Sequence, residues 1–91
     1  MIEEKDFLQK KESLEEFIKK FKDLDVGIDI KYEGDLQNCN VIVTMVARKG
    51  FEPIRITYSG DTKIVLSLVL EYCEMMNFRI YNLKSNGGHL G

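Results

Sequence analysis

The feature that most restricts the fold is the apolar character of residues 62–77, where hydrophobic side chains surround most of a predicted helix. An α-helix turns by about 100° per residue, so the apolar side chains from Ile64 to Met76 spread over roughly 240° of its circumference. A helix that packs on one face of a sheet needs an apolar stripe of little more than about 100°. This helix therefore needs a second neighbour in addition to a sheet.

The surplus apolar side of this helix consists of Leu66, Leu70 and Cys73, at an i, i+4, i+7 spacing. These residues cannot all rest on the sheet that receives Leu68 and Tyr72. Three neighbours could cover them: the first helix, the C-terminal segment folding back, or a second chain. The last possibility makes Leu66, Leu70 and Cys73 candidates for a homodimer or a protein-partner surface, because monomers rarely leave such a patch open.

Three segments in the middle of the chain alternate apolar and polar residues, as half-buried strands do. They cover residues 26–33, 41–48 and 54–59. The second segment carries β-branched residues on both faces, which is typical of a central strand. Short polar connections separate the segments, so the sequence predicts an antiparallel meander.

The N-terminal segment predicts another amphipathic helix, which ends near Asp25. Its apolar residues recur at helical spacing, with acidic residues early and lysines late. The pattern allows a start at Asp6 or at Ser13, because both open a capping-box sequence. In the second case residues 1–12 form an arm or a short separate turn.

The predicted fold class is α+β with two layers: a helix, a three-stranded antiparallel meander, a helix and a short strand. The short strand is expected over Phe78–Leu83, in a single domain of residues 1–84, followed by a flexible tail at residues 85–91. The apolar positions expected to form the core between helices and sheet are Leu14, Phe17, Phe21, Ile28, Ile30, Val43, Met45, Ile56, Leu68 and Tyr72.

Length and charge narrow the function classes. Ninety-one residues are enough for one core, and 13 Lys and Arg against 15 Asp and Glu leave a net charge of −2. No net positive field therefore attracts nucleic acid or an anionic membrane. The acidic start lacks the pattern of a secretory signal, and no apolar run approaches the length of a membrane span, so we expect a cytoplasmic protein without membrane association.

Catalysis has weak support in the sequence. His89 is the sole histidine and lies in the predicted tail, where nothing would hold it near a nucleophile. Cys39 and Cys73 lack the spacing of a metal or redox motif. Gly60-Asp61-Thr62 fits ordinary helix capping better than phosphate binding. We therefore expect a protein that is not an enzyme, with no catalytic residues, no metal site and no cofactor.

Nucleic-acid binding is the alternative function. Over residues 13–77 the element order resembles that of the double-stranded RNA-binding domain, which presses lysines at the start of its second helix onto phosphates. The basic residues that could make such contacts here are Arg48, Lys49, Arg55 and Lys63. Asp61 and Glu52 lie among them, so the sequence does not predict a continuous basic patch.

The order of helix, three-stranded meander and helix over residues 13–77 also resembles one family of small phage-encoded anti-CRISPR proteins, which inhibit bacterial CRISPR nucleases. The resemblance is one of size and element order, because residues 34–37 and 49–52 lack the acidic loops with which that family imitates DNA. It implies a small inhibitor of phage or mobile-element origin. The expected function is therefore a non-enzymatic regulatory protein that occupies the surface of a host protein.

Overall fold

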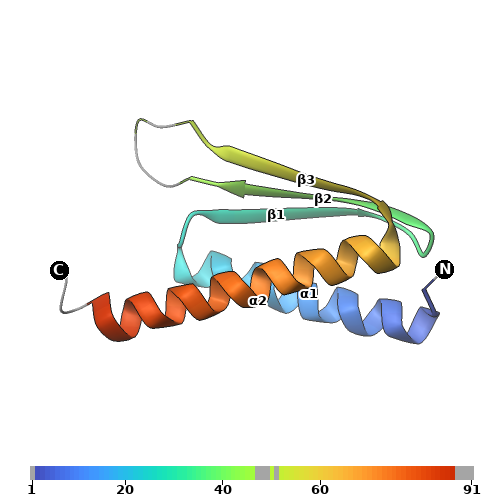
Figure 1. Cartoon of the computed structure of the whole chain (residues 1–91), viewed down its shortest axis with the longest axis horizontal. Coiled ribbons are helices and arrows are strands. Elements are labelled where there is room, and N and C mark those ends of the chain that lie inside the picture. The colour runs from blue at the N-terminus through green and yellow to red at the C-terminus, as the bar shows by residue number, and fades with distance from the viewer. Residues whose placement is uncertain (1, 47–49, 51, 88–91) are drawn as a thin grey trace.

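Five elements make up the described part of the chain, which comprises residues 2–46, 50 and 52–87 of a computed structural model, with side chains described as far as residue 82. In chain order they are α1 (Glu4–Leu24), β1 (Ile28–Gly34), β2 (Asn38–Met45), β3 (Ile54–Asp61) and α2 (Thr62–Gly87). The sheet has the order β1-β2-β3, and both pairs of neighbours are antiparallel. Figure 1 shows both helices on one face of this sheet. The predicted α+β class, with a meander between two helices, is confirmed.

The two helices run in the same direction along the sheet (Figure 1). Each connection reverses the chain, so α1 is antiparallel to β1, and α2 is antiparallel to β3. Because β1 and β3 are parallel to each other, the first and last elements of the chain lie parallel and in contact.

The turn between α1 and β1 depends on a glycine. α1 is one continuous helix, so residues 4–12 belong to it and not to a separate arm. The helix ends at Asp25, whose backbone is left-handed with φ of 51°. At Gly27 φ is 75°, and a Cβ atom would lie 2.6 Å from the carbonyl oxygen of Val46. Only glycine fits this close approach of two backbone segments.

The sheet presents an apolar face to the helices and a mostly polar face to solvent. The rows on the inner face are Ile28-Met45-Ile54, Ile30-Val43-Ile56 and Tyr32-Val41-Tyr58. Val41 and Val43 are fully buried. This burial follows from the central position of β2, which the sequence predicted.

Thr62 joins the start of α2 to the turn between β1 and β2. Its hydroxyl donates to the carbonyl oxygen of Asp35 (2.7 Å), and its amide donates to that of Gln37 (3.0 Å). The turn is itself closed by the Asp35 carboxylate, which accepts from the amides of Gln37 and Asn38. These bonds to the charged form lower the pKa of Asp35.

α2 is covered on two sides, as its wide apolar surface requires. Tyr72 faces the sheet, because its hydroxyl donates to the sulfur of Met45 (2.7 Å). Leu70 faces α1, where it lines a shallow hollow with Phe17. Leu66 and Cys73 share the azimuth of Leu70 and have no exposed surface. Cover by the first helix is therefore the outcome among the three neighbours considered.

The expectation that Leu66, Leu70 and Cys73 form a self-association or partner surface is wrong. Leu66 and Cys73 belong to the buried core, and Leu70 packs against it. Parallel packing of α1 gives these side chains an apolar neighbour within the chain. A second chain is not needed to cover them.

The expected short strand at Phe78–Leu83 is also wrong, because α2 continues without a break to Gly87. Met76 and Ile80 are four residues apart, and both pack against the core. This continued helical spacing outweighs the strand preference of the aromatic and β-branched residues in the segment. The helix thus includes residues 85–87, whereas the remainder of the predicted tail lies outside the described residues.

Nine of the ten expected core residues lie in the core or pack against it. The exception is Leu68, which is 49% exposed. α2 is rotated so that Val65 and Val69 occupy the buried positions between Leu68 and Leu66. The sequence therefore predicted how much of the circumference of α2 is buried better than it predicted which side is buried.

We expect Phe21→Ala to lower the free energy of unfolding by about 3–5 kcal/mol, because Phe21 is a fully buried aromatic side chain stacked on Phe17 with ring centroids 5.9 Å apart. The matched control is Leu8→Ala on the same helix, where the side chain is mostly exposed and the loss should stay below about 1 kcal/mol. Urea unfolding of both variants measures the difference, and equal losses would contradict the assigned core.

Candidate functional site

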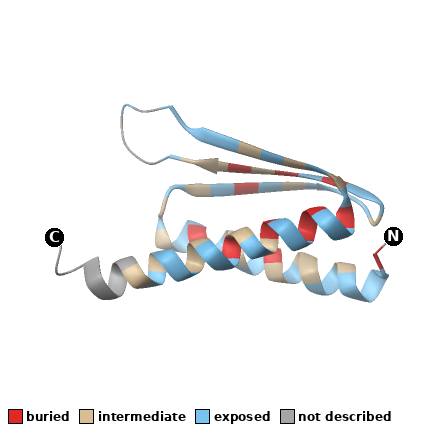
Figure 2. Cartoon of the chain, in the orientation of Figure 1, coloured by how far each residue is buried: buried red, intermediate tan, exposed pale blue. Residues whose placement is uncertain are grey.

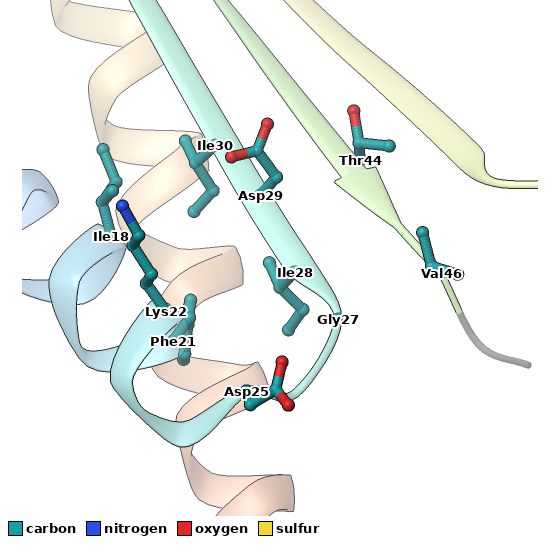
Figure 3. Close-up of a pocket in the computed structure, with 10 residues that line it drawn as sticks. All are labelled: Ile18, Phe21, Lys22, Asp25, Gly27, Ile28, Asp29, Ile30, Thr44 and Val46. Carbon is teal, nitrogen blue, oxygen red and sulfur yellow. The ribbon is translucent and has the colours of Figure 1, made fainter.

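A cleft of about 380 Å³ lies where the end of α1 meets β1 (Figure 3). Apolar side chains of Ile18, Phe21 and Ile28 line it, and Lys22 and Asp25 stand at its rim. The charged groups come from the end of α1 and from Asp29 on β1. The hydroxyl-bearing side chain of Thr44 on β2 also lines the cleft. The cleft is a seam between helix and sheet.

The two cysteines are buried and reduced, one on β2 and one on α2. Burial raises the pKa of the Cys73 thiol to about 11, and the nearby carboxylate of Glu74 adds to the effect. Burial also raises the pKa of Cys39, with a partly opposing contribution from the Thr62 hydroxyl. Reactive cysteines have a lowered pKa and solvent access, so both thiols are structural.

A buried tyrosine hydroxyl lies on β1, at the edge of the core. The hydroxyl of Tyr32 is buried without a hydrogen-bond partner, and burial raises its pKa. The ammonium group of Lys11 lies 5.9 Å from the centroids of both the Tyr32 and Phe7 rings. This cation–π pairing holds α1 to β1.

The structure does not bring the candidate nucleic-acid contacts together. Arg55 lies on the solvent face of β3, whereas Lys63 lies in the first turn of α2, in the helix layer. The six residues of strand from Arg55 to Asp61 separate them by roughly 20 Å along the sheet. Arg48 and Lys49 lie outside the described residues.

The described residues contain no group of three His, Cys, Asp or Glu side chains that could hold a metal ion. Within the same ranges, no helix is long and apolar enough to cross a membrane. His89 falls at the C-terminal end of the chain, beyond the described part.

The strongest candidate surface is the side of α2 that faces neither α1 nor the sheet. Large apolar side chains are exposed along it: Ile64 (61%), Leu68 (49%), Met75 (44%) and Phe78 (66%). Tyr81 (70%) is exposed about 60° beyond Phe78 around the helix. The outer edge of β3 lies next to the first part of this side. In Figure 2 the exposed colour recurs along α2 up to the part of the helix drawn in grey.

Sequence reasoning missed this surface although the same helical spacing contains it. Ile64, Leu68 and Met75 lie within about 40° of one another on the helix. The pattern alone cannot tell which third of an apolar circumference remains exposed, because the positions of α1 and β3 decide that. Phe78 and Tyr81 were missed because the segment was read as a strand.

Comparison of the chain with protein-family models, curated proteins and solved structures gave no match.

Raising the pH from 9 towards 11 should destabilise the protein, because Cys73 titrates near 11 in the folded chain and near 9 in the unfolded chain. Below pH 9 both states keep the proton, and the contribution is constant. Between the two values only the unfolded state ionises, which favours unfolding. The free energy of unfolding in urea, measured below pH 9 and near pH 11, should fall.

The control is Cys73→Ala, which removes this titration but leaves Cys39, Tyr32 and Tyr72, whose pKa values are also raised by burial. The fall with pH should therefore become smaller in the variant without disappearing. An identical fall in both proteins would show that Cys73 is not buried in its protonated form.

Proposed function

We propose that the chain is a small non-enzymatic regulatory protein that binds a host protein through the exposed apolar side chains in the second half of α2. The observation that carries this proposal is the placement of Met75, Phe78 and Tyr81. They are exposed, large and apolar, and they stand three residues apart on a helix that extends past the ends of α1 and β1 (Figure 1).

Met75 and Phe78 lie about 60° apart around α2, and Tyr81 lies about 60° beyond Phe78, so the three form a broad apolar strip that suits packing against another protein. Such helices anchor through residues at i, i+3 and i+7 or nearby positions. Aromatic side chains dominate the energetics of protein interfaces, because they bury a large area with few rotatable bonds. Phe78 and Tyr81 provide two aromatic anchors beside Met75, whose flexible thioether adapts to an irregular surface.

Occupation of a host protein's surface is the mode of action that fits this geometry. The binding residues lie on the outer surface of α2, so the domain behind the helix blocks access to the host surface that the helix covers. This mode agrees with the inhibitor function and the phage or mobile-element origin implied by the anti-CRISPR resemblance in size and element order.

The test replaces Phe78 with a photo-crosslinking phenylalanine analogue and irradiates the protein in a lysate of its natural host. We expect one adduct with a host protein of defined mass. The matched control carries the analogue at Leu8, an exposed apolar position on α1, and should give no such adduct. Equal adducts at both positions, or none at Phe78, would contradict the proposal.

A second measurement uses the partner so identified. Phe78→Asp should weaken its affinity by about 30-fold, the effect of losing an aromatic anchor. Leu8→Asp should leave the affinity unchanged. Because Phe78 is exposed, both variants should keep the melting temperature of the parent, so a loss of binding cannot be ascribed to unfolding.

A further inference from the structure

β3 is an edge strand whose outward backbone groups are unpaired within the described chain, since the sheet order ends with β3. The amide of Thr62 donates to the carbonyl oxygen of Gln37 at the end of the β2–β3 ladder. Antiparallel pairing alternates, so every second residue of β3 bonds to β2 and the others point outward. The outward backbone groups are those of Arg55, Thr57 and Ser59. They form a template on which another strand can pair.

The two edges of the sheet differ in how they meet solvent. On β1 the solvent-facing positions carry charges at every second residue: Asp29, Lys31 and Glu33. Charges repeated along an edge strand oppose pairing with another chain. On β3 the equivalent central positions are the uncharged Thr57 and Ser59. The charges lie at the two ends and have opposite signs.

This distribution makes β3 complementary to itself. Arg55 is positive near the start of the strand, and Asp61 is negative at its end. When two copies of β3 pair antiparallel about a two-fold axis at Tyr58, Arg55 of each copy lies opposite Asp61 of the other. Thr57 then lies opposite Ser59, whose hydroxyl donates to Asn40 within its own chain and can accept from the Thr57 hydroxyl across the strands. Asp61 Oδ2 accepts from the amide of Ile64, which leaves its other oxygen for the arginine.

The inner face of β3 fits the same register. Ile56 of one copy lies opposite Gly60 of the other. A Cβ atom at Gly60 would meet nothing within 4 Å, so the space above this glycine is open. The half-buried side chain of Ile56 from the second copy would cover it. The packing of Ile56 over Gly60 and the pairing of Arg55 with Asp61 thus favour the same register independently.

The exposed first half of α2 lies beneath this axis. Tyr58 is three residues before Asp61, or about 10 Å along the strand, and the same distance along α2 reaches Leu68. Leu68 and Ile64 are both largely exposed within one chain. Two copies related by the axis bring these side chains together, which gives them the cover that the single chain lacks.

We propose that two copies of this chain associate through β3 in this register and form one continuous six-stranded sheet with all four helices on the same face. The interface uses Ile64 and Leu68, whereas the proposed host-binding turns at Met75, Phe78 and Tyr81 lie farther along α2. The dimer therefore goes beyond the proposed function, and either proposal can fail without the other.

Disulfide trapping tests the register. Tyr58→Cys places the new thiols opposite each other in a pair with Cα atoms about 4.5 Å apart, within the range that a disulfide spans. We expect oxidation to give a covalent dimer. Thr57→Cys is the control, because in this register it lies opposite Ser59 and its own mate is too distant. Cys39 and Cys73 are buried, so the parent chain should give no covalent dimer.

Charge reversal tests the pairing of Arg55 with Asp61. Arg55→Asp or Asp61→Arg alone opposes like charges at both ends of the interface and should weaken self-association by about tenfold or more in sedimentation equilibrium. Mixing the two variants restores opposite charges and should give a heterodimer with the parental affinity. Recovery in the mixture also controls for the helix cap that Asp61→Arg removes from α2.

Three results would overturn the dimer. They are a monomeric parent chain at high micromolar concentration, trapping through Thr57→Cys but not Tyr58→Cys, and no recovery of affinity in the mixture of charge-reversed variants. A Phe78 crosslink to a host protein by a monomeric parent chain would support the proposed function while rejecting the dimer.

Discussion

The rest of the structure depends on the burial of α2 between two different neighbours. Val65 and Val69 pack on the sheet side, while Leu66 and Cys73 pack towards α1, and none of the four is more than 3% exposed. A three-stranded sheet alone is too small to bury a helix of this composition. The position of α1 beside α2, and the direction in which both lie on the sheet, follow from that requirement.

Much of the fold could be predicted, because the spacing of apolar residues along each element indicates which of its faces is buried. The alternation from Ile28 to Glu33 and the β-branched residues of β2 indicate which strand is central. The C-terminal half of α2 could not be predicted in the same way. Phe78, Ile80 and Tyr81 favour a strand as isolated residues, and only the packing of Ile80 against the core keeps the segment helical.

The candidate surfaces could be predicted less well than the fold. The exposure of a side chain depends on which other elements pack beside it, and the local sequence pattern does not indicate that. Leu66 and Leu68 are chemically identical and two residues apart, yet one is fully buried and the other half exposed. The difference arises from the rotation of α2 about its axis, which is fixed by Tyr72 on Met45 and by Thr62 on the β1–β2 turn. Neither contact has a signature in local periodicity.

The parallel contact between α1 and α2 determines when the chain can complete its core during synthesis on the ribosome. Leu14 and Phe21 belong to the first third of the chain, but the helix that they bury against begins at Thr62. Until α2 leaves the exit tunnel, α1 and the meander expose the apolar faces that it will cover. The nascent chain therefore completes its core only after α2 as far as Ile80 has left the exit tunnel.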